Sequence, residues 1–381
     1  MNQTPKSNRL HIGIFGISNA GKSTILNDIT GQESSLVSEI KGTTTDPVYK
    51  NMELFEVGPV VFIDTAGFND GTDLGLERER KTLEVMQKID IGIYVIRDNI
   101  VDYEKIKELK KKNKPILAVF NADFNINTAQ ILKNNYNIDS ILYEKEKLRQ
   151  EIKRLSQFTD KEQELVTRLV SKEDIVLLVM PQDLQAPKGR LILPQVQTIR
   201  NLLDNHCIVV AITKEQLKSA INSLKKDPSL IITDSQIFDY VYENKPEGSL
   251  LTSFSVLFAA AKGDIKEYVK GAKAISTLNE NSKVLIAEAC THAPLEEDIG
   301  RVKIPNMLRK KYGNMSITHV RGNDFPDDLS KYNLIILCGS CMFNKSHVMN
   351  RIKSAINYNV PITNYGITIA YLKGILDKVI Y

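Results

Sequence analysis

Residues 16–23 read GISNAGKS and constrain the fold more than any other stretch of the chain. They fit the pattern G-x-x-x-x-G-K-[ST], follow the apolar run HIGIFGI (11–17) and open KSTILNDI (22–29), which has helical spacing. The pattern needs this context, because backbone N–H groups of the loop and the positive end of the new helix bind phosphate together. We therefore predict a nucleotide site in which Lys22 reaches the β and γ phosphates and Ser23 ligates Mg²⁺. The residues expected to line it are Gly16, Asn19, Ala20, Gly21, Lys22, Ser23 and Thr24.

Apolar runs after this loop indicate a mainly parallel sheet. MELFEV (52–57) and VVFID (60–64) are typical of a hairpin, whereas IGIYVI (91–96) and ILAVF (116–120) are apolar throughout. Continuous apolar runs are typical of parallel strands that are buried on both faces. The predicted class is α/β, with a doubly wound phosphate-loop domain over residues 1–165.

The rest of the chain repeats strand–helix–strand patterning without a second phosphate loop. A length of 381 residues also favours two or three domains. We predict two smaller α/β domains with mostly parallel sheets, over residues 166–275 and 276–381. Residues 249–275 are apolar and rich in small side chains on one face, and predict a helix that packs against another subunit or domain.

Charge and hydropathy exclude several classes of protein. The net charge of +4 is too small to indicate a nucleic-acid partner. The N-terminal MNQTPKSNRL lacks the apolar core of a signal peptide, and no run approaches the roughly 18 apolar residues that span a membrane. We predict a cytoplasmic protein with neither a membrane nor a nucleic acid as partner.

Two later stretches fit the same nucleotide site. GTTTDP (42–47) suits a loop in which the hydroxyl of Thr44 contacts Mg²⁺. DTAG (64–67) ends the strand VVFID, so Asp64 is expected to hold Mg²⁺ directly or through water, and the N–H of Gly67 to reach the γ phosphate. In this order behind a phosphate loop, Lys22, Thr44, Asp64 and Gly67 are the predicted catalytic residues.

These motifs resemble the potassium-activated branch of the translation-factor-like GTPases. The resemblance implies GTP or GDP as ligand and a K⁺ ion on Asn19, for which simple loop capping is the alternative. Phe68 stands where many GTPases have a glutamine, which suits a cation that steadies the transferring group. The base motif N-K-x-D is expected after ILAVF, but residues 121–124 read NADF. Asn121 and Asp123 are the expected base contacts, and the strength of guanine preference stays open.

Three of the four cysteines lie where predicted strands end. Cys338 ends NLIILC (333–338), with Cys341 three residues later, and Cys290 ends VLIAEAC (284–290). Ends of neighbouring parallel strands share one sheet edge, so the three thiolates are expected to converge. Cys207 is predicted to be a small core residue. The fourth ligand is open between His292, a carboxylate of Glu296, Glu297 or Asp298, and water or a substrate. Zinc and a 4Fe-4S cluster both suit this set.

CTHAPLEEDIGRVKIP (290–305) and CGSC (338–341), behind a small GTPase domain, resemble the FeFe-hydrogenase maturation GTPases of the HydF family. The resemblance implies GTPase, dimerisation and iron–sulfur domains and a 4Fe-4S cluster on Cys290, Cys338 and Cys341, with His292 or Glu297 as possible fourth ligand. It implies a homodimer or tetramer. It also implies a scaffold that receives a diiron subcluster precursor from radical-SAM maturases and delivers it to apo FeFe-hydrogenase. Leu337 stands where many members carry histidine.

Two other functions fit the same motifs. One is a tRNA- or ribosome-associated GTPase whose cysteines hold a structural zinc. The other is a redox or lyase enzyme that uses the cluster directly, with a regulatory nucleotide domain. The metal that is bound separates the first of these from the iron–sulfur scaffold.

Overall fold

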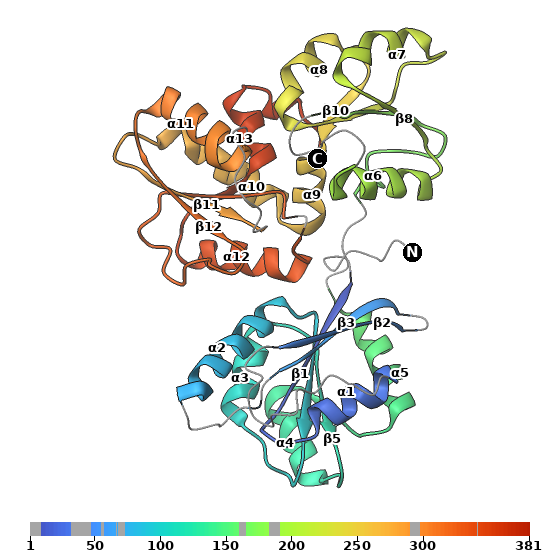
Figure 1. Ribbon diagram of the computed structural model, residues 1–381, viewed down its shortest axis with the longest axis vertical. Coiled ribbons are helices and arrows are strands. Elements are labelled where there is room, and N and C mark those ends of the chain that lie inside the picture. Colours follow the sequence, from blue (N-terminus) through green and yellow to red (C-terminus); the bar gives the residue numbers. More distant parts are fainter. Residues whose placement is uncertain are drawn as a thin grey trace. The chain divides into compact units, whose positions relative to one another are not determined.

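The computed structural model describes residues 9–31, 47–54, 57–65, 67, 73–159, 165–182, 191–289, 298–340 and 342–381, with side chains undescribed at 73–79. The chain divides into two compact units, residues 1–161 and 162–381. Figure 1 shows both units, and each is described by itself.

The first unit is built on a six-stranded sheet in the order β2-β3-β1-β4-β5-β6. Its strands are β1 (Leu10–Phe15), β2 (Val48–Leu54), β3 (Gly58–Asp64), β4 (Ile91–Ile96), β5 (Ile116–Phe120) and β6 (Asp139–Leu142). All neighbours are parallel except β2 and β3, which form the predicted antiparallel pair. Every residue of β4 and β5 is buried, which confirms that these apolar runs are central strands.

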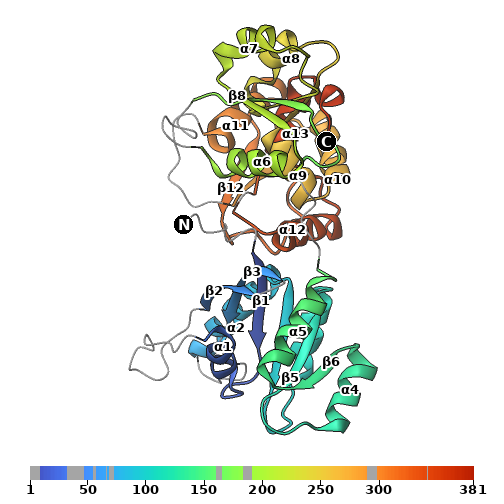
Figure 2. The ribbon, with the colours of Figure 1, turned by 90° about the vertical axis from the view of Figure 1, so that its right-hand side faces the viewer.

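Helices cover both faces of this sheet, as a doubly wound domain requires (Figure 2). They are α1 (Lys22–Thr30), α2 (Asp73–Lys88), α3 (Tyr103–Lys111), α4 (Ile126–Tyr136) and α5 (Lys145–Ser156). Apolar side chains of α1 and α5 form the core on one face, and those of α2, α3 and α4 form the core on the other. The predicted phosphate-loop α/β class is confirmed.

The second unit begins with a four-stranded parallel sheet in the order β10-β9-β7-β8. Its strands are β7 (Ile175–Val179), β8 (Ile208–Ile212), β9 (Leu230–Thr233) and β10 (Leu250–Ser253). The connecting helices are α6 (Leu193–Asp204), η2 (Lys214–Gln216), α7 (Leu217–Ser223), η3 (Ser235–Ile237) and α8 (Phe238–Asn244). Cys207 lies just before β8 and is 7% exposed, in the core between α6 and the sheet, as predicted.

The single helix predicted over 249–275 is wrong. Its first residues form the strand β10, and the rest form α9 (Phe254–Lys262), α10 (Ile265–Lys273) and η4 (Ala274–Thr277). Ser253 and Asp264 cap α9 and α10 by accepting hydrogen bonds from backbone N–H groups, so each starts a new helix. Almost all of α9 is buried, and it packs against α6, α12 and α13, which explains its apolar composition within one chain.

A second parallel sheet follows, in the order β12-β11-β13-β14. Its strands are β11 (Lys283–Glu288), β12 (Ser316–Arg321), β13 (Leu334–Leu337) and β14 (Ile362–Asn364). Its helices are η5 (Ile299–Lys303), α11 (Ile304–Tyr312), α12 (Lys345–Asn357), α13 (Tyr365–Leu372) and η6 (Leu376–Lys378). Two four-stranded parallel sheets within residues 165–381 agree with the two smaller α/β domains expected from the sequence.

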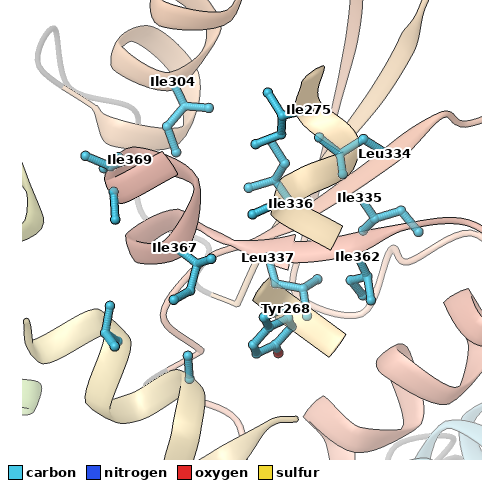
Figure 3. Close-up of a cluster of buried hydrophobic side chains, with 14 of the residues drawn as sticks. Tyr268, Ile275, Ile304, Leu334, Ile335, Ile336, Leu337, Ile362, Ile367 and Ile369 are labelled. Carbon is cyan, nitrogen blue, oxygen red and sulfur yellow. The ribbon is translucent and has the colours of Figure 1, made fainter. Parts of the chain in front are cut away.

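One hydrophobic core joins the two sheets of the second unit. It includes Leu177 and Ile231 of the first sheet and Ile286 and Ile336 of the second. Figure 3 shows its part around β13, where Tyr268 of α10 lies beside Leu337. Of the helices that the structure describes, none is long and apolar enough to cross a membrane.

Candidate functional site

The phosphate loop follows β1 and is held close to two neighbouring strands. Gly16 and Gly21 have positive φ angles, +143° and +91°, which favour glycine. A Cβ on Gly16 would lie 2.5 Å from the carbonyl oxygen of Val95 in β4, and one on Gly21 would clash with the amide of Asn121. The loop therefore depends on glycine both for its backbone conformation and for its close packing.

The side chain of Lys22 lies on the inside of this loop. Its Nζ donates hydrogen bonds to the carbonyl oxygens of Gly16, at 3.1 Å, and Ile17, at 2.8 Å. Burial lowers the pKa of Lys22, while the charge of Asp64 opposes that shift. The ammonium group is thus fixed at the centre of the loop, where the sequence predicted a contact with phosphate.

Ser23 and Asp64 meet where a magnesium ion was predicted. Ser23 Oγ donates a 2.5 Å hydrogen bond to Asp64 Oδ2, while Oδ1 is buried without a hydrogen-bond partner among the described residues. Burial raises the pKa of Asp64, and the Ser23 hydroxyl and Lys22 oppose this. A hydroxyl beside a buried carboxylate oxygen with an unused lone pair fits a hard cation such as Mg²⁺.

The remaining predicted nucleotide contacts are partly described. A Cβ on Gly67 would lie 2.5 Å from the backbone N of Ser18, so Gly67 borders the loop, as its predicted role requires. Asn19 is left-handed, with φ at +63°, and its carbonyl oxygen accepts a 3.4 Å hydrogen bond from Arg97, which sequence reasoning missed. Thr44 and Phe68 lie outside the described residues.

The residue that directly follows β5 contacts the phosphate loop on the side where the nucleotide base is expected. Asn121 Nδ2 donates a 2.9 Å hydrogen bond to the carbonyl oxygen of Ala20. Asp123 is exposed, and the ring of Phe124, in the last position of the expected base motif, packs against Phe120 with centroids 4.9 Å apart. Asn121 thus has a structural reason for its position, and Asp123 as a base contact stays a prediction.

The second candidate site lies at the shared edge of β11 and β13. These strands are parallel neighbours, with Ala287 opposite Leu337, so they end together as predicted. Cys338 follows β13, and its Sγ accepts hydrogen bonds from the N–H of Ala289, at 3.0 Å, and of Ser340, at 3.4 Å. Two backbone donors on one sulfur suit a thiolate, which is the form that binds metal.

The other predicted ligands cannot be placed around Cys338. Cys290, His292, Glu296, Glu297 and Cys341 lie outside the described residues, and within the described ones no three His, Cys, Asp or Glu side chains converge on a metal position. Asp298 is buried and accepts a hydrogen bond from the N–H of Arg301, at the start of η5. The convergence of three thiolates therefore stays a prediction.

Charged side chains lie near this sheet edge, and the sequence did not indicate that Glu288, Arg351 and Lys262 are buried. Glu288, the last residue of β11, forms ion pairs with Arg301, at 3.0 Å, and Arg321, at 3.6 Å. Arg351 of α12 is 5% exposed, and Lys262 of α9 is 1% exposed. Arg351 follows the buried Val348 by about one helical turn, so the two share a face of α12. That spacing was the signal in the sequence that Arg351 is buried.

Family comparisons divide the chain as the sheets do. Residues 165–263 match the hydrogen maturase F dimerization domain, and residues 266–381 match the hydrogen maturase F tetramerization domain. Residues 11–122 match the 50S ribosome-binding GTPase family. The chain has the domain architecture of the HydF hydrogenase maturases. A GTPase domain thus precedes two domains that are named for oligomerisation in that family.

Curated relatives match the GTPase domain. GTPase Der of Kosmotoga olearia is 34% identical over 30% of this chain and 28% of its own length. GTPase Der of Wolinella succinogenes is 41% identical over 23% of this chain and 19% of its own. The tRNA modification GTPase MnmE of Helicobacter pylori strain Shi470 is 36% identical over 32% of this chain and 28% of its own length. The chain thus spans less than a third of the length of these curated relatives.

Proposed function

We propose that this protein is a cytoplasmic, GTP-hydrolysing scaffold that assembles a diiron subcluster precursor and delivers it to apo FeFe-hydrogenase. The observation that supports this most is the position of Cys338 in a chain with HydF architecture. Its sulfur accepts a hydrogen bond from the residue before Cys290, at the edge where two parallel strands end. Such an edge is where parallel sheets bind ligands.

The proposed GTPase site uses positioning and charge. Lys22 is already held inside the loop and is available to the β and γ phosphates. Ser23, Asp64 and Thr44 would hold Mg²⁺, which supplies positive charge that neutralises the phosphates when bound. Gly67 would donate its N–H to the γ phosphate, and Asn19 would hold K⁺. GTP and GDP are the proposed ligands, with Asn121 supporting the loop.

The proposed metal centre is a 4Fe-4S cluster on Cys290, Cys338 and Cys341. Three thiolates leave one coordination position, which His292 or Glu297 would fill, or which would stay exchangeable for a ligand of the incoming precursor. Radical-SAM maturases would supply that precursor. The two oligomerisation domains suggest that the scaffold works as a dimer or tetramer.

Nucleotide state is proposed to control partner exchange. A ligand shifts a conformational equilibrium only if it binds the two states with different affinity, and switch loops ordered by the γ phosphate and Mg²⁺ supply such a difference. Affinities for apo-hydrogenase should therefore differ between the GTP, GDP and nucleotide-free forms. Equal affinities in the three forms would remove this coupling from the proposal.

Anaerobic reconstitution with iron and sulfide tests the metal centre. The wild-type protein should bind both, become brown, and then activate apo-hydrogenase after loading with the diiron precursor. Cys338→Ser should lose iron and activation. Cys207→Ser is the matched control, because Cys207 lies in the core next to β8, in the other sheet of the same unit. Stoichiometric zinc in place of iron would favour the tRNA- or ribosome-associated GTPase instead.

A further inference from the structure

Arg351 is a buried cation in the helix that follows the Cys338–Cys341 loop. It lies on the inner face of α12 together with Val348, Ile352 and Ala355, and is 5% exposed. Burying a guanidinium group is costly unless hydrogen bonds and negative charge compensate it. The surroundings of Arg351 therefore show what kind of group belongs beside it.

The described surroundings supply contacts but no negative carboxylate. Nη2 of Arg351 donates to the carbonyl oxygen of Gly322, and the guanidinium carbon lies 4.8 Å and 4.6 Å from the ring centroids of Phe325 and Phe343. Within the described part of the chain, Nε has no hydrogen-bond partner and no Asp or Glu forms an ion pair with Arg351. Arg301 and Arg321 differ, because both pair with Glu288.

Arg351 lies beside the loop that begins at Cys338, because its guanidinium packs on the ring of Phe343 and donates to Gly322, which follows β12, the neighbour of β11. Burial lowers the pKa of Arg351 to about 10, and electrostatic interactions with Cys338 and Tyr268 oppose that shift. At that pKa the guanidinium stays charged near neutral pH. The Tyr268 hydroxyl is not a competing anion, because burial raises its pKa and keeps it neutral. A second buried cation, Lys262, donates a 2.9 Å hydrogen bond to the carbonyl oxygen of Phe343, near the same loop.

We propose that Arg351 is a positioning residue whose fixed positive charge compensates the negative charge of an iron–sulfur cluster on Cys338. This inference rests on the proposed function. A cluster on three thiolates has net negative charge, which increases when the cluster accepts an electron. Net charge, hydrogen bonds to sulfur and solvent exposure set the reduction potential of such clusters. A buried cation is weakly screened, so it should favour both retention of the cluster and its reduction.

The test compares three substitutions in the full-length protein after anaerobic reconstitution. Arg351→Met removes the charge at similar volume, and Arg351→Lys keeps it. Lys353→Met removes one charge from the exposed face of the same helix. Iron and sulfide content, circular dichroism, and the midpoint potential from an EPR-monitored redox titration are measured for each variant.

We expect Arg351→Met to make reduction at least tenfold less favourable, which lowers the one-electron midpoint potential by about 59 mV. Arg351→Lys should shift it much less, and Lys353→Met should leave it unchanged. An unchanged or higher potential in Arg351→Met would overturn the inference. If Arg351→Met is folded but loses the cluster, Arg351→Lys must retain it, and loss in both variants would also overturn the inference. Failure of the wild-type protein to bind iron would instead refute the proposed function.

Discussion

The sulfur of Cys338 accepts a 3.0 Å hydrogen bond from the backbone N–H of Ala289. The two residues are 49 positions apart, and each follows the end of a strand, β13 and β11 respectively. This bond fixes Cys338 beside the residue that precedes Cys290. It therefore connects the two chain segments that carry the proposed cluster ligands.

Replacing Ala289 with proline removes this N–H donor. Glu288 before it is in a strand, and an extended residue tolerates a following proline. We expect Ala289→Pro to bind less than half of the wild-type iron after reconstitution, because Cys338 loses both a donor and its alignment with Cys290. Ala289→Gly keeps the donor and should bind iron normally. Equal iron contents in the two variants would show that this hydrogen bond does not support the site.

Asn121 is expected to support nucleotide binding through the phosphate loop. Loss of its 2.9 Å hydrogen bond to Ala20 in Asn121→Ala should cost about 1 kcal/mol, which is roughly a fivefold loss of GTP affinity. Asn125→Ala is the control, since Asn125 caps α4 by accepting a hydrogen bond from the N–H of Thr128. That control should lower stability by about 1 kcal/mol but leave affinity intact. Fluorescent GTP titration and urea unfolding measure the two quantities.

Asp64 should oppose stability and support magnesium binding at neutral pH. Its folded-state pKa is raised, mainly by burial, so the stability that it contributes is present below the ordinary pKa of 3.8 and is lost as pH rises through the raised value. Asp64→Asn should therefore stabilise the nucleotide-free protein near pH 7 and weaken Mg²⁺-dependent GTP binding by roughly 10–100-fold. Differential scanning calorimetry and binding titrations in Mg²⁺ or EDTA measure these effects.

The control for Asp64 is Asp98→Asn. Asp98 is exposed and has a φ of +53°, which asparagine tolerates, so the substitution removes one charge without strain. It should change neither Mg²⁺ dependence nor thermal stability. A loss of stability in Asp64→Asn, relative to this control, would mean that Asp64 is not held as an unfavourable buried charge.

Glu288 is expected to stabilise the second unit through its buried ion pairs. Removing its charge in Glu288→Gln leaves Arg301 and Arg321 without their shared partner and should cost about 3 kcal/mol of unfolding free energy. The exposed pair of Arg200 and Asp204 provides the comparison, and Asp204→Asn should cost less than about 1 kcal/mol. Chemical denaturation monitored by circular dichroism measures the unfolding free energy of both variants. Similar costs would indicate that the Glu288 cluster is well hydrated.

Strand predictions were accurate where apolar runs are continuous. IGIYVI and ILAVF are central strands because side chains on both of their faces must be buried between helix layers. The prediction over 249–275 failed, because apolar composition does not distinguish a strand from a buried helix. N-caps at Ser253 and Asp264 start two separate helices within that stretch. Each cap is a single polar residue, which is a weak signal in an apolar sequence.

The sequence alone determined the phosphate loop and the order of the cysteines, and it predicted the residues that would contact Mg²⁺. Each of these depends on residues within a few positions of one another or on the ends of apolar strands, so local chemistry defines them. Only the tertiary structure decided that Arg351 and Glu288 are buried near the edge at which β11 and β12 end. A charged residue on a helix or at a strand end is exposed or buried according to what packs over it. That packing comes from segments far away in the chain.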